Sequence, residues 1–268
     1  MNTILLSSMI LAAIGVLAAV ILYFVSQKFK VYEDPKIDEI AALLPGANCG
    51  GCGFAGCRNF AETIVKNEGL NDLSCPPGGS AVNSAIAKMF GGGTQELTPK
   101  IMIVRCNGSC TNAPAKVKYD SISSCAYFNM VNAGENGCAF GCLGCGDCVK
   151  ACKFNSIHID NVTMLPVIDS SCVSCGACKK ACPRGIIDIV PKHEQGTVYV
   201  ACMNKDKGAE AKKNCAVACI GCKKCEKICE YSAILVENNL SVINGTTCTA
   251  CKKCVEGCPT KAIHAICD

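Results

Sequence analysis

Four copies of one cysteine spacing constrain the fold of this chain more than any other feature. Each run has three cysteines with two residues between neighbours, and a fourth cysteine after three more residues. The runs begin at Cys142, Cys172, Cys219 and Cys248. Three closely spaced thiolates suit one face of a [4Fe–4S] cube, and the fourth cysteine of such a run ligates a second cube. Zinc sites usually show separate Cys-x2-Cys pairs instead. The runs therefore predict iron–sulfur clusters in pairs, which indicates electron transfer.

The four runs form an internal repeat of two halves, because Cys142 to Cys219 and Cys172 to Cys248 are nearly equal offsets. A short apolar segment follows each run, and we expect four strands that pair into hairpins around the clusters, at 156–159, 185–190, 233–236 and 261–266. Each half then reads as a two-cluster bacterial ferredoxin module of the α+β class, at 101–191 and 192–268. Within each half, the fourth cysteine of each run ligates the cube of the other run. The resulting ligand sets are Cys142, Cys145, Cys148 and Cys182; Cys172, Cys175, Cys178 and Cys152; Cys219, Cys222, Cys225 and Cys258; and Cys248, Cys251, Cys254 and Cys229.

A separate cysteine set precedes the repeat, within a predicted domain at 28–92. It comprises Cys49, Cys52, Cys57 and Cys75 in a glycine-rich segment. Glycines let backbone amides approach the sulfurs, so we expect one isolated cube, with a structural zinc site as the alternative. Apolar spacing predicts flanking helices over 34–44 and 58–67, and a third helix over 80–90.

Seven cysteines remain outside these sets. Val104-Arg-Cys106 resembles Val200-Ala-Cys202, and Cys138 and Cys215 each stand four positions before the start of a run. The first half of the repeat has an insertion that the second half lacks. Four of the seven remaining cysteines lie in this half, and they are enough for a sixth cube or a zinc ion: Cys106, Cys110, Cys125 and Cys138. The alternative is that they are buried thiols acting as small hydrophobic side chains. We expect Cys202, Cys215 and Cys267 to be structural thiols.

The stretch from Ile4 to Val25 is apolar and uncharged, and its about 22 residues are enough to span a bilayer as a helix. We place a membrane anchor at 1–27. A signal peptide is the alternative, but it would have a basic start and a shorter apolar core. Lys28 and Lys30 follow the stretch, which predicts a single pass through the cytoplasmic (inner) membrane with the bulk of the chain on the cytoplasmic side. Thiols stay reduced there and remain available as metal ligands.

Composition and charge limit the classes of function that the chain can have besides electron transfer. The chain has 27 cysteines and no tryptophan, so bound metal is expected to contribute to folding as well as to redox chemistry. The formal charge of +4 would fall to about −6 with five cubes of charge about −2 each. Nothing indicates nucleic-acid binding. The three histidines are scattered and no nucleotide-binding loop is present, so the sequence predicts no catalytic site of its own.

The order of an apolar N-terminal helix, the Cys49–Cys57 segment with distal Cys75, and paired ferredoxin runs resembles the RnfB family, the iron–sulfur subunits of Rnf complexes. The likeness covers essentially the whole chain, and the N-terminal set resembles the single-cluster domain of corrinoid iron–sulfur proteins. The second ferredoxin module and the Cys106–Cys138 insertion resemble an extended form of this family.

The resemblance implies a component of an ion-translocating ferredoxin:NAD oxidoreductase. It would accept electrons from soluble ferredoxin and pass them through at least five [4Fe–4S] clusters, or six, toward membrane and peripheral partner subunits. NAD reduction and Na⁺ or H⁺ movement would belong to those partners. We expect electrons to leave through the cube of the N-terminal set, because only a short segment separates it from the anchor. The alternative function is a membrane-anchored protein that stores or donates clusters or senses redox state.

Overall fold

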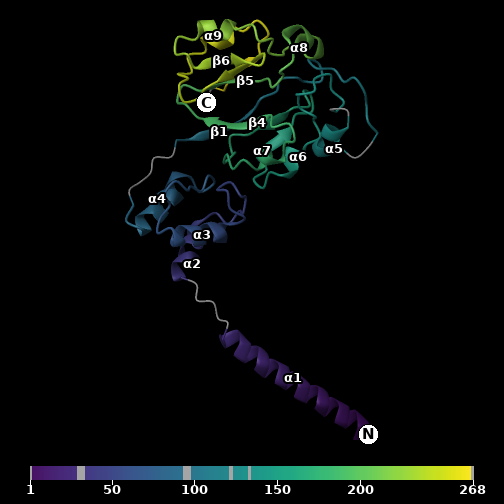
Figure 1. Ribbon diagram of the computed structural model, residues 1–268, viewed down its shortest axis with the longest axis vertical. Helices are drawn as coiled ribbons and strands as arrows, with labels where there is room; N and C mark the ends of the chain where they lie inside the picture. The colour runs from purple at the N-terminus through teal and green to yellow at the C-terminus, as the bar shows by residue number, and fades with distance from the viewer. Residues whose placement is uncertain (1, 29–33, 93–97, 121–122, 132–133, 267–268) are drawn as a thin grey trace.

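The computed structural model describes residues 2–28, 34–92, 98–120, 123–131 and 134–266, so Lys30 and Cys267 lie outside the described residues. Four parts follow one another along the long axis of the molecule, in chain order (Figure 1). They are an N-terminal helix, a small helical unit and two similar modules of short strands and helices. The predicted α+β class is confirmed.

The N-terminal helix is α1, Asn2–Lys28. It projects away from the rest of the chain (Figure 1), and its stretch Leu5–Lys28 is apolar and long enough to cross a membrane by length and composition, with none of it buried in the protein. Leu17 and Phe24, for example, are about two-thirds exposed (65% and 66%). No part of the described structure covers this apolar surface, so α1 is a candidate membrane span.

The helical unit confirms the three helices expected around the first cysteine set, to within one or two residues: α2 Pro35–Leu43, α3 Cys57–Lys66 and α4 Gly79–Met89. Asp34 caps α2 by accepting a hydrogen bond from the Lys36 amide at 2.9 Å, and Pro35 occupies the first turn. Ile40, Phe60 and Ile86 come from the three helices and form a small core.

Within the described residues, each of the two modules contains four short strands. Those of the first module are β1 Lys100–Val104, β2 Ile157–Ile159, β3 Pro166–Ile168 and β4 Ile187–Pro191. Those of the second are β5 Thr197–Val200, β6 Ile234–Glu237, β7 Leu240–Ile243 and β8 Ile263–Ile266. In each module the middle strands form an antiparallel hairpin, while the first strand pairs antiparallel with the last.

This pairing corrects one expectation. The four expected strands are present as β2, β4, β6 and β8, but only β2 and β6 belong to hairpins. β4 and β8 pair instead with β1 and β5, which precede all the cysteines of their module's runs. The sequence signal for β1 and β5 is short, and pairing over such a distance along the chain leaves no local pattern.

Short helices complete the modules: α5 Cys125–Met130, α6 Asp147–Lys150, α7 Ala177–Ala181, α8 Gly208–Asn214, α9 Lys224–Ile228 and α10 Lys253–Glu256. One helix from each run, namely α6, α7, α9 and α10, carries the third cysteine of that run, and this cysteine is buried in all four. The repeat in sequence is therefore also a repeat in local structure.

Candidate iron–sulfur sites

All four cysteines of the N-terminal set line one pocket. Cys49, Cys52, Cys57 and Cys75 share it with Phe60 at the end of the unit's core. The loop reaches this arrangement through left-handed backbone at glycines, for example φ of +71° at Gly50, where a residue with a β-carbon would be strained. The structure thus brings together the four thiols that the spacing grouped.

Two asparagine side chains fix the backbone at this pocket. Asn48 accepts a hydrogen bond from the Cys57 amide through its Oδ1 at 2.8 Å. Buried Asn83 accepts from the Cys75 amide at 2.8 Å and donates through Nδ2 to the Cys75 carbonyl at 3.0 Å. Cys75 is itself only 6% exposed, so the asparagine replaces water as its backbone partner.

The N-terminal loop also contacts the first module. Lys153 donates from Nζ to the carbonyls of Ala47 at 3.3 Å and Asn48 at 2.8 Å. Lys180 donates to the Gly50 carbonyl at 3.1 Å. Gly51 lies so close that a β-carbon on it would stand 2.8 Å from the Cys175 carbonyl oxygen. The cysteine loops of two separate units therefore meet directly.

A pocket of the first module gathers cysteines from both of its runs. Cys142 and Cys148 of the first run line it together with Cys182, the last cysteine of the second run. Arg184 borders the pocket and donates to the Gly141 carbonyl at 2.6 Å. Cys125 lines the same pocket, although its place in the chain gave no sign of this.

Neighbouring thiols at two further sites lie as the exchange between runs predicts. Burial raises the pKa of Cys175, and the thiols of Cys49, Cys152 and Cys172 raise it further. Burial likewise raises the pKa of Cys248, as do Cys229 and Cys251 nearby. Cys152 and Cys229 are the fourth cysteines of the first and third runs, so each lies beside the following run. A charge shifts the pKa of a group only from nearby, so these effects show that the thiols are neighbours, and that Cys49 of the N-terminal set also lies near Cys175.

Burial also raises the pKa of thiols on the short helices α6, α7 and α10. The pKa rises to about 11 for Cys148 and Cys254 and to about 12 for Cys178. Such thiols stay protonated at neutral pH unless a cationic group replaces the proton, and metals bind cysteine as the thiolate. Every described cysteine is a free thiol. The donor set therefore fits iron–sulfur clusters in its chemistry. Nowhere in the described structure do three or more Cys, His, Asp or Glu side chains gather as around a single ion.

The four cysteines of the insertion go to three different places. Cys110 is exposed and its thiol donates to the Val162 carbonyl at 3.3 Å. Cys125 lies with the first run, as described above. Cys106 and Cys138 line a third pocket together with Cys202 and Cys215, which the sequence left as structural thiols. The matching tripeptides around Cys106 and Cys202 were the sequence signal for this grouping.

Family models of iron–sulfur domains match most of the cysteine-rich part of the chain. A family described as "Putative Fe-S cluster" matches residues 44–77. Two families described as 4Fe-4S dicluster domains match 141–187 and 171–233, and a 4Fe-4S binding domain matches 241–264. The second dicluster match crosses from the second run into the third. Together with the pockets, these matches define a multicluster iron–sulfur protein built for electron transfer.

Curated relatives cover nearly the whole chain. The B subunit of an ion-translocating oxidoreductase complex from Methanosarcina acetivorans is 41% identical over 98% of this chain and 99% of its own length. The B subunit of a proton-translocating ferredoxin:NAD(+) oxidoreductase complex from Clostridium ljungdahlii is 38% identical over 99% and 94%. A Na(+)-translocating counterpart from Acetobacterium woodii is 38% identical over 98% and 78%. The chain belongs to the RnfB family, the B subunits of Rnf-type ion-translocating oxidoreductase complexes.

Proposed function

We propose that this chain carries electrons from reduced ferredoxin to the membrane part of an Rnf-type complex through at least five [4Fe–4S] clusters. The observation that supports this most directly is the contact between the Gly51 loop and Cys175, which joins the N-terminal site to the first module. A [4Fe–4S] cluster takes up and releases one electron without other chemistry, and the protein sets its potential through burial and hydrogen bonds to sulfur. Reduction of NAD and ion movement then belong to partner subunits.

The ligands of the five clusters are the twenty cysteines of the N-terminal set and the four exchanged sets. The N-terminal set is supported by one pocket that all four thiols line. The exchange between runs is supported by the pocket that Cys182 shares with Cys142 and Cys148. It is supported further by the proximity of Cys152 to Cys175 and of Cys229 to Cys248.

The order of the sites along the molecule supports one direction for the path. Module 2 is farthest from α1, module 1 follows, and the N-terminal site lies nearest to α1 (Figure 1). We infer that α1 crosses the membrane once with the rest of the chain on the cytoplasmic side, where soluble ferredoxin is available. Electrons then enter at a ferredoxin-like module and leave through the site of Cys49, Cys52, Cys57 and Cys75.

Storage or donation of clusters is the alternative function. It would require exposed and labile ligands. The proposed ligands meet this requirement only in part: Cys222 and Cys251 are exposed, whereas Cys75, Cys148 and Cys254 are only 6% to 7% exposed. Resistance of the clusters to a mild chelator, with reversible reduction by dithionite, would separate a relay from a donor.

Replacement of Cys52 by Ala in the assembled complex tests the direction of transfer. Reduced ferredoxin should still bleach the visible absorbance of the clusters in the two modules, while ferredoxin-dependent NAD reduction by the complex should fall at least tenfold. Ser80→Ala, on the exposed surface of α4, is the matched control and should keep both activities. Full NAD reduction in the Cys52→Ala complex would refute the N-terminal site as the exit.

A further inference from the structure

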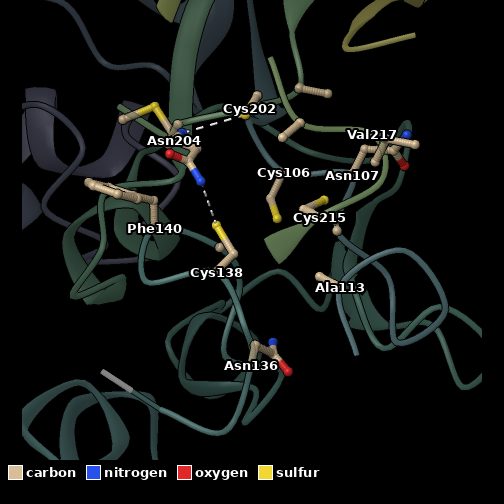
Figure 2. Close-up of a pocket in the computed structure, with 15 residues that line it drawn as sticks. Cys106, Asn107, Ala113, Asn136, Cys138, Phe140, Cys202, Asn204, Cys215 and Val217 are labelled. Atoms are coloured by element: carbon tan, nitrogen blue, oxygen red, sulfur yellow. Dashed lines mark hydrogen bonds between the residues drawn. The ribbon is translucent and has the colours of Figure 1, made fainter. Parts of the chain in front are cut away.

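The pocket at the junction of the two modules is lined by four cysteines that belong to none of the five cluster sites. Cys106 and Cys138 come from module 1, and Cys202 and Cys215 come from module 2. Figure 2 shows the sulfurs of Cys106, Cys138 and Cys215 directed toward the same space, with Asn204 between Cys138 and Cys202. The pocket holds about 380 Å³ of empty space, part of it open to solvent.

The two cysteine pairs occupy equivalent positions in the repeat. Cys106 follows β1 and Cys202 follows β5, in each case by two residues. The Cys142 amide donates to the Cys106 sulfur at 3.3 Å, and the Cys219 amide donates to the Cys202 sulfur at 3.3 Å. Each module therefore presents the same half-site, held next to the first cysteine of its first run.

The insertion in module 1 brings the two half-sites together. The Ala216 amide donates to the Asn112 carbonyl at 2.8 Å, which joins the insertion to the segment after Cys215. Buried Ala113 of the insertion packs in the core of module 2, and Met203 of module 2 packs against the core of module 1. A β-carbon on Gly108 would stand 3.5 Å from the Cys215 sulfur and 3.6 Å from the Cys106 sulfur. The junction is therefore built around these thiols.

The surroundings of the sulfurs are those of a buried redox cluster. Cys138, Cys202 and Cys215 are between 6% and 8% exposed. Asn204, which is 1% exposed, donates from Nδ2 to the Cys138 sulfur at 3.4 Å and from its backbone amide to the Cys202 sulfur at 3.5 Å. Hydrogen bonds to ligand sulfur, inside an apolar wall that includes Phe140 and Val217, are the features that tune iron–sulfur potentials.

A single zinc ion fits the pocket less well. A tetrahedral ion needs four sulfurs at about 2.3 Å from one point. The four thiols line a pocket instead, and in the described residues they are not gathered as around one ion. The same is true of the runs that family models match as 4Fe-4S domains, so this spacing is compatible with a larger inorganic cluster.

We propose that Cys106, Cys138, Cys202 and Cys215 hold a sixth [4Fe–4S] cluster that bridges the two ferredoxin-like modules. The role of this cluster as a link in the electron path rests on the proposed function, whereas its presence does not. The electron balance is that of a relay. One electron leaves a reduced cluster of one module, reduces the bridging cluster by one electron, and then passes to a cluster of the other module. No bond forms or breaks.

Iron and acid-labile sulfide in the full-length chain, purified without oxygen, test the proposal. Six clusters require about 24 irons and 24 sulfides per chain, against about 20 of each for five. The Cys138→Ala and Cys215→Ala variants, one from each module, should each lose about one sixth of both. Cys110→Ser changes a cysteine of the same insertion that lies outside the pocket, so it should lose neither.

Paramagnetic resonance after dithionite reduction shows whether the variants keep their other clusters. This distinguishes the loss of one cluster from unfolding of the chain. The wild-type count provides a second test that needs no variant. A wild-type chain with about 20 irons, or with about 20 irons and one zinc, would overturn the proposal. If six clusters are present but ferredoxin reduces none of them, the proposed function fails and the bridging site stands.

Discussion

Asn83 shows why an amide side chain is required beside the N-terminal site. It accepts from the amide of Cys75 and donates to the carbonyl of the same residue, and it is 4% exposed. A carboxylate could accept but not donate, and an apolar side chain could do neither. Glycine at position 78 adds to this constraint, because a β-carbon there would lie 3.3 Å from the Cys75 sulfur. The position of this thiol is thus fixed by residues that are not ligands.

We predict that Asn83→Leu weakens the N-terminal site without touching a ligand. The substitution leaves the buried amide and carbonyl of Cys75 without partners, at a cost of about 1–3 kcal/mol for each group. The four irons of this site should then be lost faster under a chelator, as followed by absorbance, while the clusters of the two modules are retained. Asn59→Leu, on the exposed face of α3, is the control. Equal rates of iron loss in the two variants would contradict the role of Asn83.

The four short helices that carry the third cysteine of each run, α6, α7, α9 and α10, show how the same element is made from different residues. Each begins after a residue with left-handed backbone, with φ of 78° at both Gly146 and Gly176, 60° at Lys223 and 63° at Lys252. Glycine takes this conformation freely, whereas lysine does so at a cost of about 1–2 kcal/mol. Module 2 therefore accepts strain at the starts of α9 and α10, since the cysteine spacing on either side demands the turn.

The contact between the N-terminal loop and module 1 includes hydrogen bonds from two lysines, Lys153 and Lys180. We predict that Lys153→Met loosens this contact, because it removes hydrogen bonds from a charged donor to two carbonyls, worth about 1 kcal/mol at an exposed site. Amide hydrogen exchange in the segment 47–57 should accelerate about fivefold. Lys213→Met, at the exposed end of α8, should leave that segment unchanged. Unaltered exchange in Lys153→Met would show that the packing of Gly51 on Cys175 suffices alone.

The elements were predictable from sequence where the pattern is local. The apolar spacing over 34–44 predicted α2, and the apolar residues after each cysteine run predicted β2, β4, β6 and β8. The partners of β4 and β8 were not predictable, because β1 and β5 lie far upstream and are as short as ordinary loop segments. The same limit applies to Cys202 and Cys215. Their resemblance to Cys106 and Cys138 was visible, but only the packing of two modules shows that equivalent thiols meet.

At the scale of the whole molecule, both junctions between cluster-bearing units are made by cysteine loops. The N-terminal loop meets module 1 at Cys175, and module 1 meets module 2 at the pocket of Figure 2. Electron tunnelling requires short distances between clusters, so a junction built from the ligand loops themselves keeps neighbouring sites close. The units could not be separated by long linkers and still serve as one path.

The N-terminal helix takes no part in these junctions, and this allows a test of its role. None of the described stretch Leu5–Lys28 is buried in the protein. We predict that deletion of residues 1–28 leaves iron and sulfide per chain unchanged, moves the protein to the soluble fraction, and abolishes ferredoxin-dependent NAD reduction by membranes. Replacement of α1 by an unrelated apolar helix of equal length should restore membrane attachment and most of the activity, since the span from Ile4 to Val25 has no charged residue to conduct ions. Intact mass of the mature chain checks that α1 is retained, because a cleaved signal peptide would be missing from it. If the truncated chain stays in salt-washed membranes, partner subunits rather than α1 provide the attachment.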